Sequence, residues 1–183
     1  SLADIARVIS MDAAISARIL RIANSSLFIT HHPTEDLTTA LTIIGIQQAH
    51  DLILATSVID SFSAHDTGLF DLRSFWRHNL AVAVATRCIS AERGATTVDR
   101  MFIVGILHDI GRLVLMQNEQ QRYRDVLAHS QHHRHNLFTS EHLLLGCDHG
   151  EVGAALCATW NLSPMIQTCC AAHHHPQRGT SHK

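Results

Sequence analysis

His108 and Asp109 lie side by side inside the apolar segment Met101–Arg112. An ionised carboxylate is rarely buried unless it is paired or binds a metal. Imidazole and carboxylate together are also a common donor set for divalent metals. A structural hydrogen bond within a helical core would explain an isolated His-Asp pair equally well. The choice between a metal site and a structural pair therefore depends on which other side chains share that core.

Sixteen of the 183 residues are histidine, which is the one unusual feature of the composition. Seven of them stand in polar surroundings and are interpreted as surface residues. This group comprises His129, His132, His133 and His135 in the polar segment 128–136, His31 and His32 before Pro33, and His182 near the end. A short histidine-rich tract can bind metal opportunistically, but solvated side chains are the simpler interpretation of the segment 128–136.

Four other histidines fall on the apolar faces of separate predicted helices. Helical spacing groups His78 with Val82, Ala85 and Ile89, His108 with Met101 and Val104, His149 with Val152, Leu156 and Trp160, and His173 with Ile166 and Cys170. We therefore expect these four histidines to face the interior, with His174 beside the last of them. The cores of helix bundles are places where facing helices build metal sites.

The elements that must position these side chains all have helical periodicity, and no segment gives a convincing strand. The predicted helices cover about 2–9, 13–22 after an Asp12 cap, 37–44 ending at Gly45, 49–59, 71–93 after an Asp71 cap, 98–117, 149–160, and a last one beginning at Pro164. The stretch 118–136 is expected to be polar, with a solvated helix end and loop. Gly105 and Gly111 flank the His-Asp pair and predict a close approach of backbones there.

Composition narrows the class of protein. Hydrophobic residues make up 46% and charged residues 16% of the chain, which indicates one globular domain and no disordered protein. A net charge of −2 offers no basic field for nucleic acid or an anionic membrane, and no apolar run is long enough to span one. Five cysteines without a CxxC spacing are interpreted as reduced core thiols of a cytoplasmic protein.

Several motifs resemble, in order, those of the HDOD domain, the HD-related output domain of bacterial signalling proteins. They are Phe75-Trp-Arg-His78, Gly105-Ile-Leu-His-Asp-Ile-Gly111, Glu141 with Gly146-Cys-Asp-His149 and Val152-Gly-Ala154, Trp160-Asn-Leu-Ser-Pro164, and His173-His-His-Pro176, preceded by the N-terminal segments 9–26 and 40–45. The resemblance covers nearly the whole chain. It implies an all-α, multi-helix bundle of HD-domain-like architecture, one domain over 1–183 with an N-terminal helical part (1–68) and an HD-like part (69–183).

The HD superfamily contains metal-dependent phosphohydrolases, including the HD-GYP enzymes that open cyclic di-GMP. Carried over by motif, the implied metal ligands are His78, His108, Asp109, His149, His173 and His174, and the implied metal is Mn, Fe or Zn. A metal held there would polarise a phosphodiester and lower the pKa of bound water. No residue is assigned a catalytic role from the sequence.

This sequence departs from the active enzymes at three points. No Gly-Tyr-Pro follows His173, Arg112 stands where HD-GYP proteins commonly have lysine, and the late aspartate ligand has no counterpart. HDOD domains are generally regarded as regulatory modules. The primary expectation is therefore a non-enzymatic signalling or scaffold domain with a degenerate metal site, excised from a longer protein. Its partners would be signalling proteins or other domains of the parent chain, with self-association left open. The alternative is a metal-dependent phosphohydrolase or nucleotide-binding domain.

Overall fold

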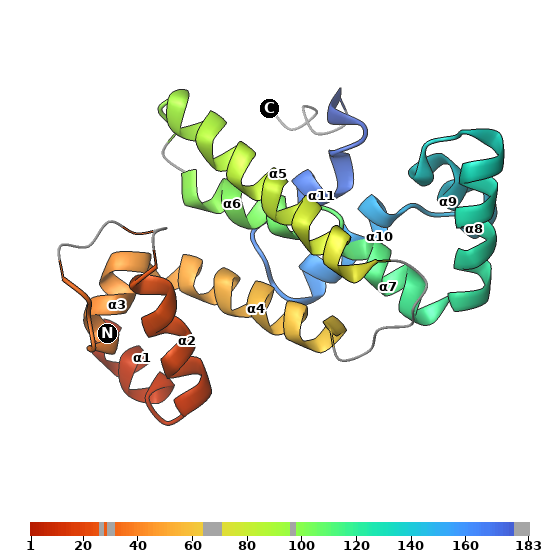
Figure 1. The fold of residues 1–183 in the computed structure, drawn as a ribbon. Coiled ribbons are helices and arrows are strands. Elements are labelled where there is room, and N and C mark those ends of the chain that lie inside the picture. Colours follow the sequence, from red (N-terminus) through yellow and green to blue (C-terminus); the bar gives the residue numbers. More distant parts are fainter. Residues whose placement is uncertain (26–27, 29–31, 64–70, 96–97, 178–183) are drawn as a thin grey trace. The chain divides into compact units, whose positions relative to one another are not determined.

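The computed structural model describes residues 1–25, 28, 32–63, 71–95 and 98–177 (Figure 1). Apart from a short 3-10 turn at residues 176–177, the regular secondary structure in these residues is α-helical, which confirms the predicted fold class. No helix among them is long and apolar enough to cross a membrane. The chain divides into two compact units, Ser1–Ile59 and Asp60–Lys183. That the two form one domain, divided at residue 68, stays a prediction.

The first unit is built from α1 (Leu2–Ile9), α2 (Ala13–Ala23), α3 (Leu37–Ile44) and the greater part of α4 (Ile46–Ser63). The predicted helix boundaries are confirmed by their caps. The Asp12 carboxylate accepts hydrogen bonds from the first backbone N–H groups of α2, and α3 ends at Gly45, whose φ of 86° favours glycine. Helix α4 begins directly after Gly45 and is longer at both ends than the predicted 49–59.

In the second unit, α5 (Leu72–Glu92) packs closely on α6 (Val98–Leu107), and the two helices lie side by side (Figure 1). A Cβ atom on Gly105 would lie 2.3 Å from the Ala83 Cα, so only glycine permits this approach. The buried side chains of α5 are Phe75, Asn79 and Ala83, and the Asn79 side-chain amide donates to the Ile106 carbonyl. The predicted interior face of α5 was therefore wrong by one position, and His78 is exposed.

The predicted single helix over 98–117 is interrupted at the His-Asp pair. Helix α6 ends at Leu107, and α7 (Ile110–Asn118) begins after Asp109. The His108 ring donates from Nδ1 to the Gly105 carbonyl, and the Arg112 N–H bonds the Asp109 carbonyl. This local break is why His108 and Asp109 project from a junction and not from the side of one continuous helix.

Helices α10 (His149–Thr159) and α11 (Pro164–Ala172) complete the packing around that junction. A Cβ atom on Gly111 would lie 1.9 Å from the His149 carbonyl oxygen, which confirms the close backbone approach predicted for both glycines. The cysteines are unpaired, as expected, but only Cys157 and Cys170 are buried and Cys88 is exposed.

Between α7 and α10 the chain forms two further helices. The stretch 118–136 is mostly helical, because α8 (Gln120–His133) occupies it, and α9 (Leu137–Leu145) follows. Helix α8 buries Tyr123 and Val126 and packs on α9. The sequence predicted a polar stretch with a helix end and loop but no full helix, and a few buried apolar residues suffice to hold this otherwise polar helix.

Candidate metal centre

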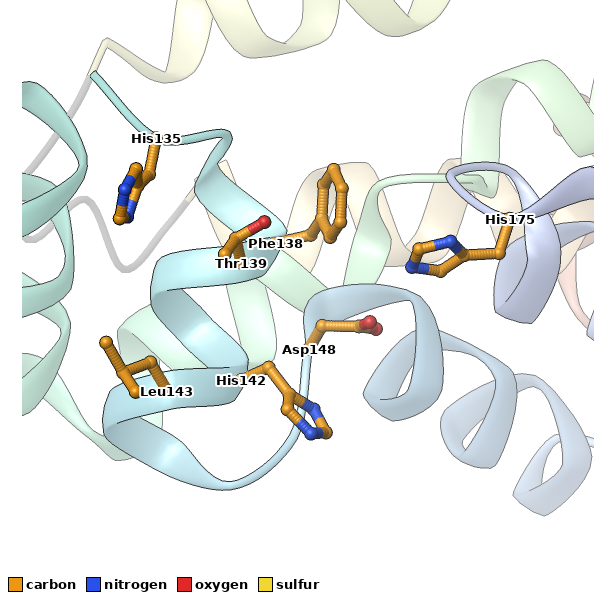
Figure 2. Close-up of a pocket in the computed structure, with 7 residues that line it drawn as sticks. All are labelled: His135, Phe138, Thr139, His142, Leu143, Asp148 and His175. Carbon is orange, nitrogen blue, oxygen red and sulfur yellow. The ribbon is translucent and has the colours of Figure 1, made fainter. Parts of the chain in front are cut away.

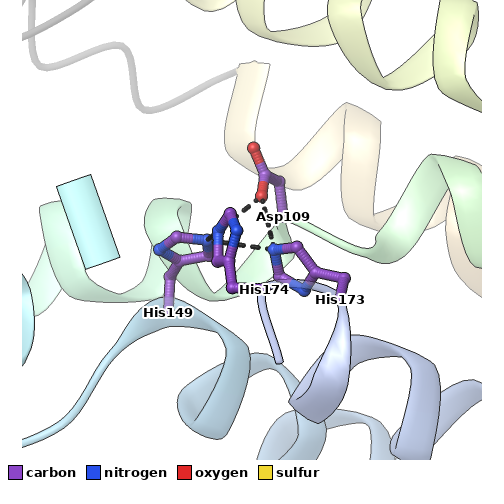
Figure 3. Close-up of side chains that lie close together, drawn as sticks. All are labelled: Asp109, His149, His173 and His174. Atoms are coloured by element: carbon purple, nitrogen blue, oxygen red, sulfur yellow. Dashed lines mark hydrogen bonds and ion pairs between the residues drawn. The ribbon is translucent and has the colours of Figure 1, made fainter. Parts of the chain in front are cut away.

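All six predicted ligands belong to two overlapping groups of side chains in the second unit. Figure 3 shows four of them, Asp109, His149, His173 and His174, directed toward one another from three segments of the chain. Ligand atoms of these four lie within 4.8 Å of one another, and those of His78, His108 and Asp109 form a second such group. Asp109 belongs to both groups.

The Oδ1 atom of Asp109 is the centre of the cluster. It lies 3.2 Å from Nε2 of His149, 3.3 Å from Nε2 of His173 and 3.5 Å from Nε2 of His108. Nε2 of His174 lies 2.9 Å from Nε2 of His149. The other carboxylate oxygen, Oδ2, accepts a hydrogen bond from Arg112 Nη1 at 3.0 Å. One oxygen of the aspartate therefore faces the imidazoles, and the other is held by a cation.

The remaining nitrogen of three rings is hydrogen-bonded away from the centre. His108 donates from Nδ1 to the Gly105 carbonyl at 2.8 Å, and His173 to the Cys170 carbonyl at 2.7 Å. His149 donates from Nδ1 to the Glu141 carboxylate. Metal-binding histidines almost always donate their second N–H to a carbonyl or carboxylate, which fixes the tautomer and directs the free nitrogen to the ion. The donor set thus fits a metal ion bound through Nε2 atoms.

Glu141 contacts a candidate ligand, His149, and was not predicted to be a site residue from the sequence. Its side chain is fully buried and accepts hydrogen bonds from the Tyr123 hydroxyl at 2.8 Å and from the His149 backbone N–H at 2.9 Å, besides the His149 ring. It lies on α9, eight residues before the histidine that it orients. Its presence in the motif series was the only signal, because a lone glutamate in a helix looks like a surface residue.

Hydrogen bonds within the cluster lower the pKa of Asp109 and raise the pKa of His149. Burial alone would raise the pKa of Asp109, but hydrogen bonds from His149 and His173 outweigh it and hold that pKa well below its usual range. Burial would lower the pKa of His149, but hydrogen bonds to Asp109 and Glu141 raise it to about 9. Without metal, His149 therefore carries a proton on each ring nitrogen at neutral pH.

Two other histidines of the cluster are shifted in the opposite direction. Burial and the neighbouring rings of His173 and His149 lower the pKa of His174 to about 4. Burial likewise lowers the pKa of His108, although Asp109 opposes the shift. Both rings are therefore neutral at pH 7, which is the form that binds metals.

His78 is the outlying member of the set. Its side chain is exposed, contrary to the prediction of an interior position, yet its ring centre lies 5.4 Å from that of His108. It stands on α5 next to the buried Asn79, at the edge of the helix face that packs on α6. A ligand placed there reaches the centre from the solvent side.

Two pockets adjoin the cluster. The first, of 390 Å³, includes His108 and His173 in its wall, and its other lining residues are apolar or small: Val82, Thr86, Val104, Gly105, Thr168, Cys169, Ala172 and Pro176. The second, of 330 Å³, lies beside α9 and includes Phe138, His142 and His175 (Figure 2). Phe138, which lines this pocket, stacks on the His174 ring with centres 4.5 Å apart.

Comparison with known proteins agrees with this architecture. The family profile described as HDOD domain matches residues 1–176. A solved "Putative phosphohydrolase" from Shewanella amazonensis SB2B is 27% identical, with a TM-score of 0.74 over 97% of this chain and 62% of its own. The MmoQ response regulator from Methylococcus capsulatus str. Bath is 25% identical, with a TM-score of 0.51 over 94% of this chain and 67% of its own.

A curated relative from Treponema pallidum (strain Nichols), described as an uncharacterized protein, is 26% identical over 198 residues. The present chain matches it over its full length but spans only 35% of that relative. The solved structures are likewise longer than the matched region. The chain therefore corresponds to only part of each of these proteins.

Proposed function

Because the chain belongs to the HDOD domain family, we propose that it is a regulatory domain of a bacterial signalling protein that binds a divalent metal and acts through protein contacts. The observation that supports the metal is the common orientation of His108, His149 and His173. Each uses Nδ1 for a hydrogen bond and directs Nε2 toward Asp109.

The residues that would hold the ion are Asp109, His149, His173 and His174, with His78 and His108 available for a second one. Imidazole nitrogens with one carboxylate suit Mn, Fe or Zn. A bound ion would supply positive charge that ties the α6–α7 junction to the start of α10 and the end of α11. The metal would then stabilise the arrangement of helices that a partner recognises.

The pocket next to His108 and His173 favours a regulatory role over hydrolysis. Among its described lining residues none is lysine or arginine, so an anionic phosphodiester would find no side-chain cation there. Helix α5 also exposes Leu80, Val84 and Ile89, which are half-exposed or more and offer apolar contact area. The MmoQ response regulator of similar fold supports a signalling context.

Partners would be signalling proteins or other domains of the parent chain, in the cytoplasm. Nucleic acid and membranes are not expected partners, because the net charge is −2 and no basic surface is indicated. Self-association is compatible with this role, and size-exclusion chromatography with light scattering would measure it.

Metal content per chain is the first test, measured by elemental mass spectrometry on protein purified without a histidine tag or chelator. We expect stoichiometric metal in the wild type, its loss in Asp109→Asn and the loss of only a second ion in His108→Ala, with both variants folded by circular dichroism. The same wild-type preparation should show no turnover of a phosphodiester such as bis(p-nitrophenyl) phosphate above that of Asp109→Asn. A folded wild type that carries no metal after reconstitution with Mn, Fe or Zn contradicts the proposal.

One observation favours a second candidate, a metal-dependent phosphohydrolase. Asp109 is shared by two donor groups, and a carboxylate between two ions is the arrangement with which two-metal enzymes cleave phosphate esters. The "Putative phosphohydrolase" of similar fold agrees with this candidate. Metal-dependent turnover of a phosphodiester that disappears in Asp109→Asn would establish it. Turnover that persists in that variant would exclude this centre as the source.

A further inference from the structure

We propose a second transition-metal site, formed at the surface by His129, His133 and His135 at the C-terminal end of α8. It shares no residue with the His/Asp cluster and does not depend on the function proposed above. The sequence alone favoured solvated side chains for these histidines. The structure shows that they gather at one place.

Helical spacing brings the first two rings together. His129 and His133 are four residues apart on α8, and their ring centres lie 4.4 Å apart. Residues at i and i+4 lie on the same helix face, so two imidazoles at this spacing can bind one ion. His132, at i+3 from His129, has its ring centre 4.7 Å from that of His133 and stands at right angles to it.

The end of the helix adds the third ring. Arg134 adopts the left-handed conformation, with φ of 53°, which turns the chain back at the end of α8. His135 is then held twice by Ser130: its N–H donates to the Ser130 carbonyl, and the Ser130 hydroxyl donates to the His135 carbonyl at 2.8 Å. Its ring centre comes to lie 5.5 Å from that of His129 and 5.7 Å from that of His133.

These separations suit a shared ion. With metal–nitrogen distances of about 2.0–2.1 Å, three rings around a tetrahedral ion have centres roughly 5 Å apart. In the His/Asp cluster, ring centres of His149, His173 and His174 lie 4.0–5.2 Å apart. The surface nitrogens are not gathered within 4.8 Å as those of the cluster are. Because His133 and His135 are exposed, their side chains can rotate to bring them together.

His129 already has the hydrogen bond that prepares a metal ligand. Its Nδ1 lies 3.0 Å from the hydroxyl oxygen of Ser140, which is fully buried on α9. A donor bond from Nδ1 to that hydroxyl leaves Nε2 free to bind a metal. Imidazole ligands suit zinc, copper and nickel, and water would complete the coordination.

Zinc binding to the tag-free protein tests the site, with stoichiometry from native mass spectrometry and affinity from competition with a chromophoric chelator. We expect His133→Ala combined with His135→Ala to bind one zinc ion fewer than the wild type, while the His/Asp cluster keeps its metal. Both side chains are exposed, so the fold should be unchanged. Ser140→Ala should weaken the surface site by about tenfold.

His32→Ala is the matched control, since it removes an exposed histidine that lies outside this cluster. It should retain the full zinc stoichiometry. The proposal is overturned if the double variant binds as many zinc ions as the wild type with the same affinity. It is also overturned if His32→Ala lowers zinc binding as much, because zinc would then bind exposed histidines without selection.

Discussion

Replacing Glu141 with glutamine changes the charge behind His149 while keeping the shape of the side chain. An amide oxygen turned toward His149 still accepts from its backbone N–H and from Nδ1–H. The amide NH₂ then meets the Tyr123 hydroxyl, which can accept a hydrogen bond as well as donate one. The variant therefore tests the negative charge with the packing preserved.

Loss of the charge has two opposite effects on the apparent metal affinity of the protein. In the metal-bound state, a hydrogen-bonded carboxylate makes the imidazole a stronger ligand. Changing such a partner costs 10–100-fold in affinity, and about tenfold, or about 1.4 kcal/mol, is expected where a neutral acceptor remains. In the metal-free state, His149 has a pKa of about 9. A metal must displace that proton, which weakens apparent binding by about 100-fold at pH 7.

These consequences predict a difference in pH profile. In the wild type, log affinity should rise by about one for each pH unit up to about pH 9, where His149 loses its proton. In Glu141→Gln the neutral partner lowers the pKa of His149, so the plateau begins at lower pH and is about tenfold lower. The two proteins should differ most above pH 9 and converge toward pH 6.5.

The assay is zinc affinity of tag-free protein by chelator competition between pH 6.5 and 9.5. Tyr123→Phe is the control, because it removes one donor to Glu141 and leaves the charge and the contacts to His149. It should keep the wild-type profile. Parallel profiles with equal plateaus for Glu141→Gln and the wild type would refute the reasoning, since the carboxylate would then have no influence on His149.

Three further predictions concern stability. The metal-free protein should lose stability as the pH rises, because protonated His149 stabilises the fold fully below pH 6.5, the pKa of an unfolded histidine, and no longer above about pH 9. Urea midpoints should therefore be higher at pH 6 than at pH 9.5, and the opposite order would mean that His149 is neutral in the folded state. Manganese at 100 times its dissociation constant should stabilise the protein by about 2.7 kcal/mol, so chelator should lower the thermal midpoint of the manganese-loaded wild type but leave that of Asp109→Asn unchanged. Gly111→Ala should destabilise by 3 kcal/mol or more, roughly, since its Cβ would overlap the His149 carbonyl, whereas Gly94→Ala, in open space at φ of 64°, should cost about 1–2 kcal/mol in chemical denaturation.

Helix boundaries were the part of the fold that the sequence predicted best, because caps are local. Asp12, Asp71 and Gly45 act through their own side chain or backbone conformation within a few residues, so their types alone indicate where helices start and stop. The break between α6 and α7 was not predicted from the sequence. Helix α7 packs on α10 directly after the break, and a local pattern does not report such a contact between distant segments.

The buried faces of the helices were predicted less well, because the closest helix packing is made by small or polar residues that a hydropathy pattern does not mark as buried. The interior of α5 is set by Asn79 and Ala83 against α6, and that of α10 by Gly150 and Gly153. An apolar periodicity follows large side chains, so it selected His78 with Val82 and Ile89, one position away from the buried face. His149 was nevertheless placed correctly, since it is buried at the first turn of α10.

Ligand residues at the centre stand at helix ends, and backbone contacts bring those ends together. His108 and Asp109 form the α6–α7 junction, His149 begins α10 and His173 caps α11. Gly111 touches the His149 carbonyl, and a Cβ on Gly150 would lie 2.9 Å from the Cys170 carbonyl, three residues before His173. The same backbone approaches that exclude larger side chains therefore fix where the imidazoles meet. It follows that substitutions at these glycines should disturb the positions of the ligands even where the ligands themselves are unchanged.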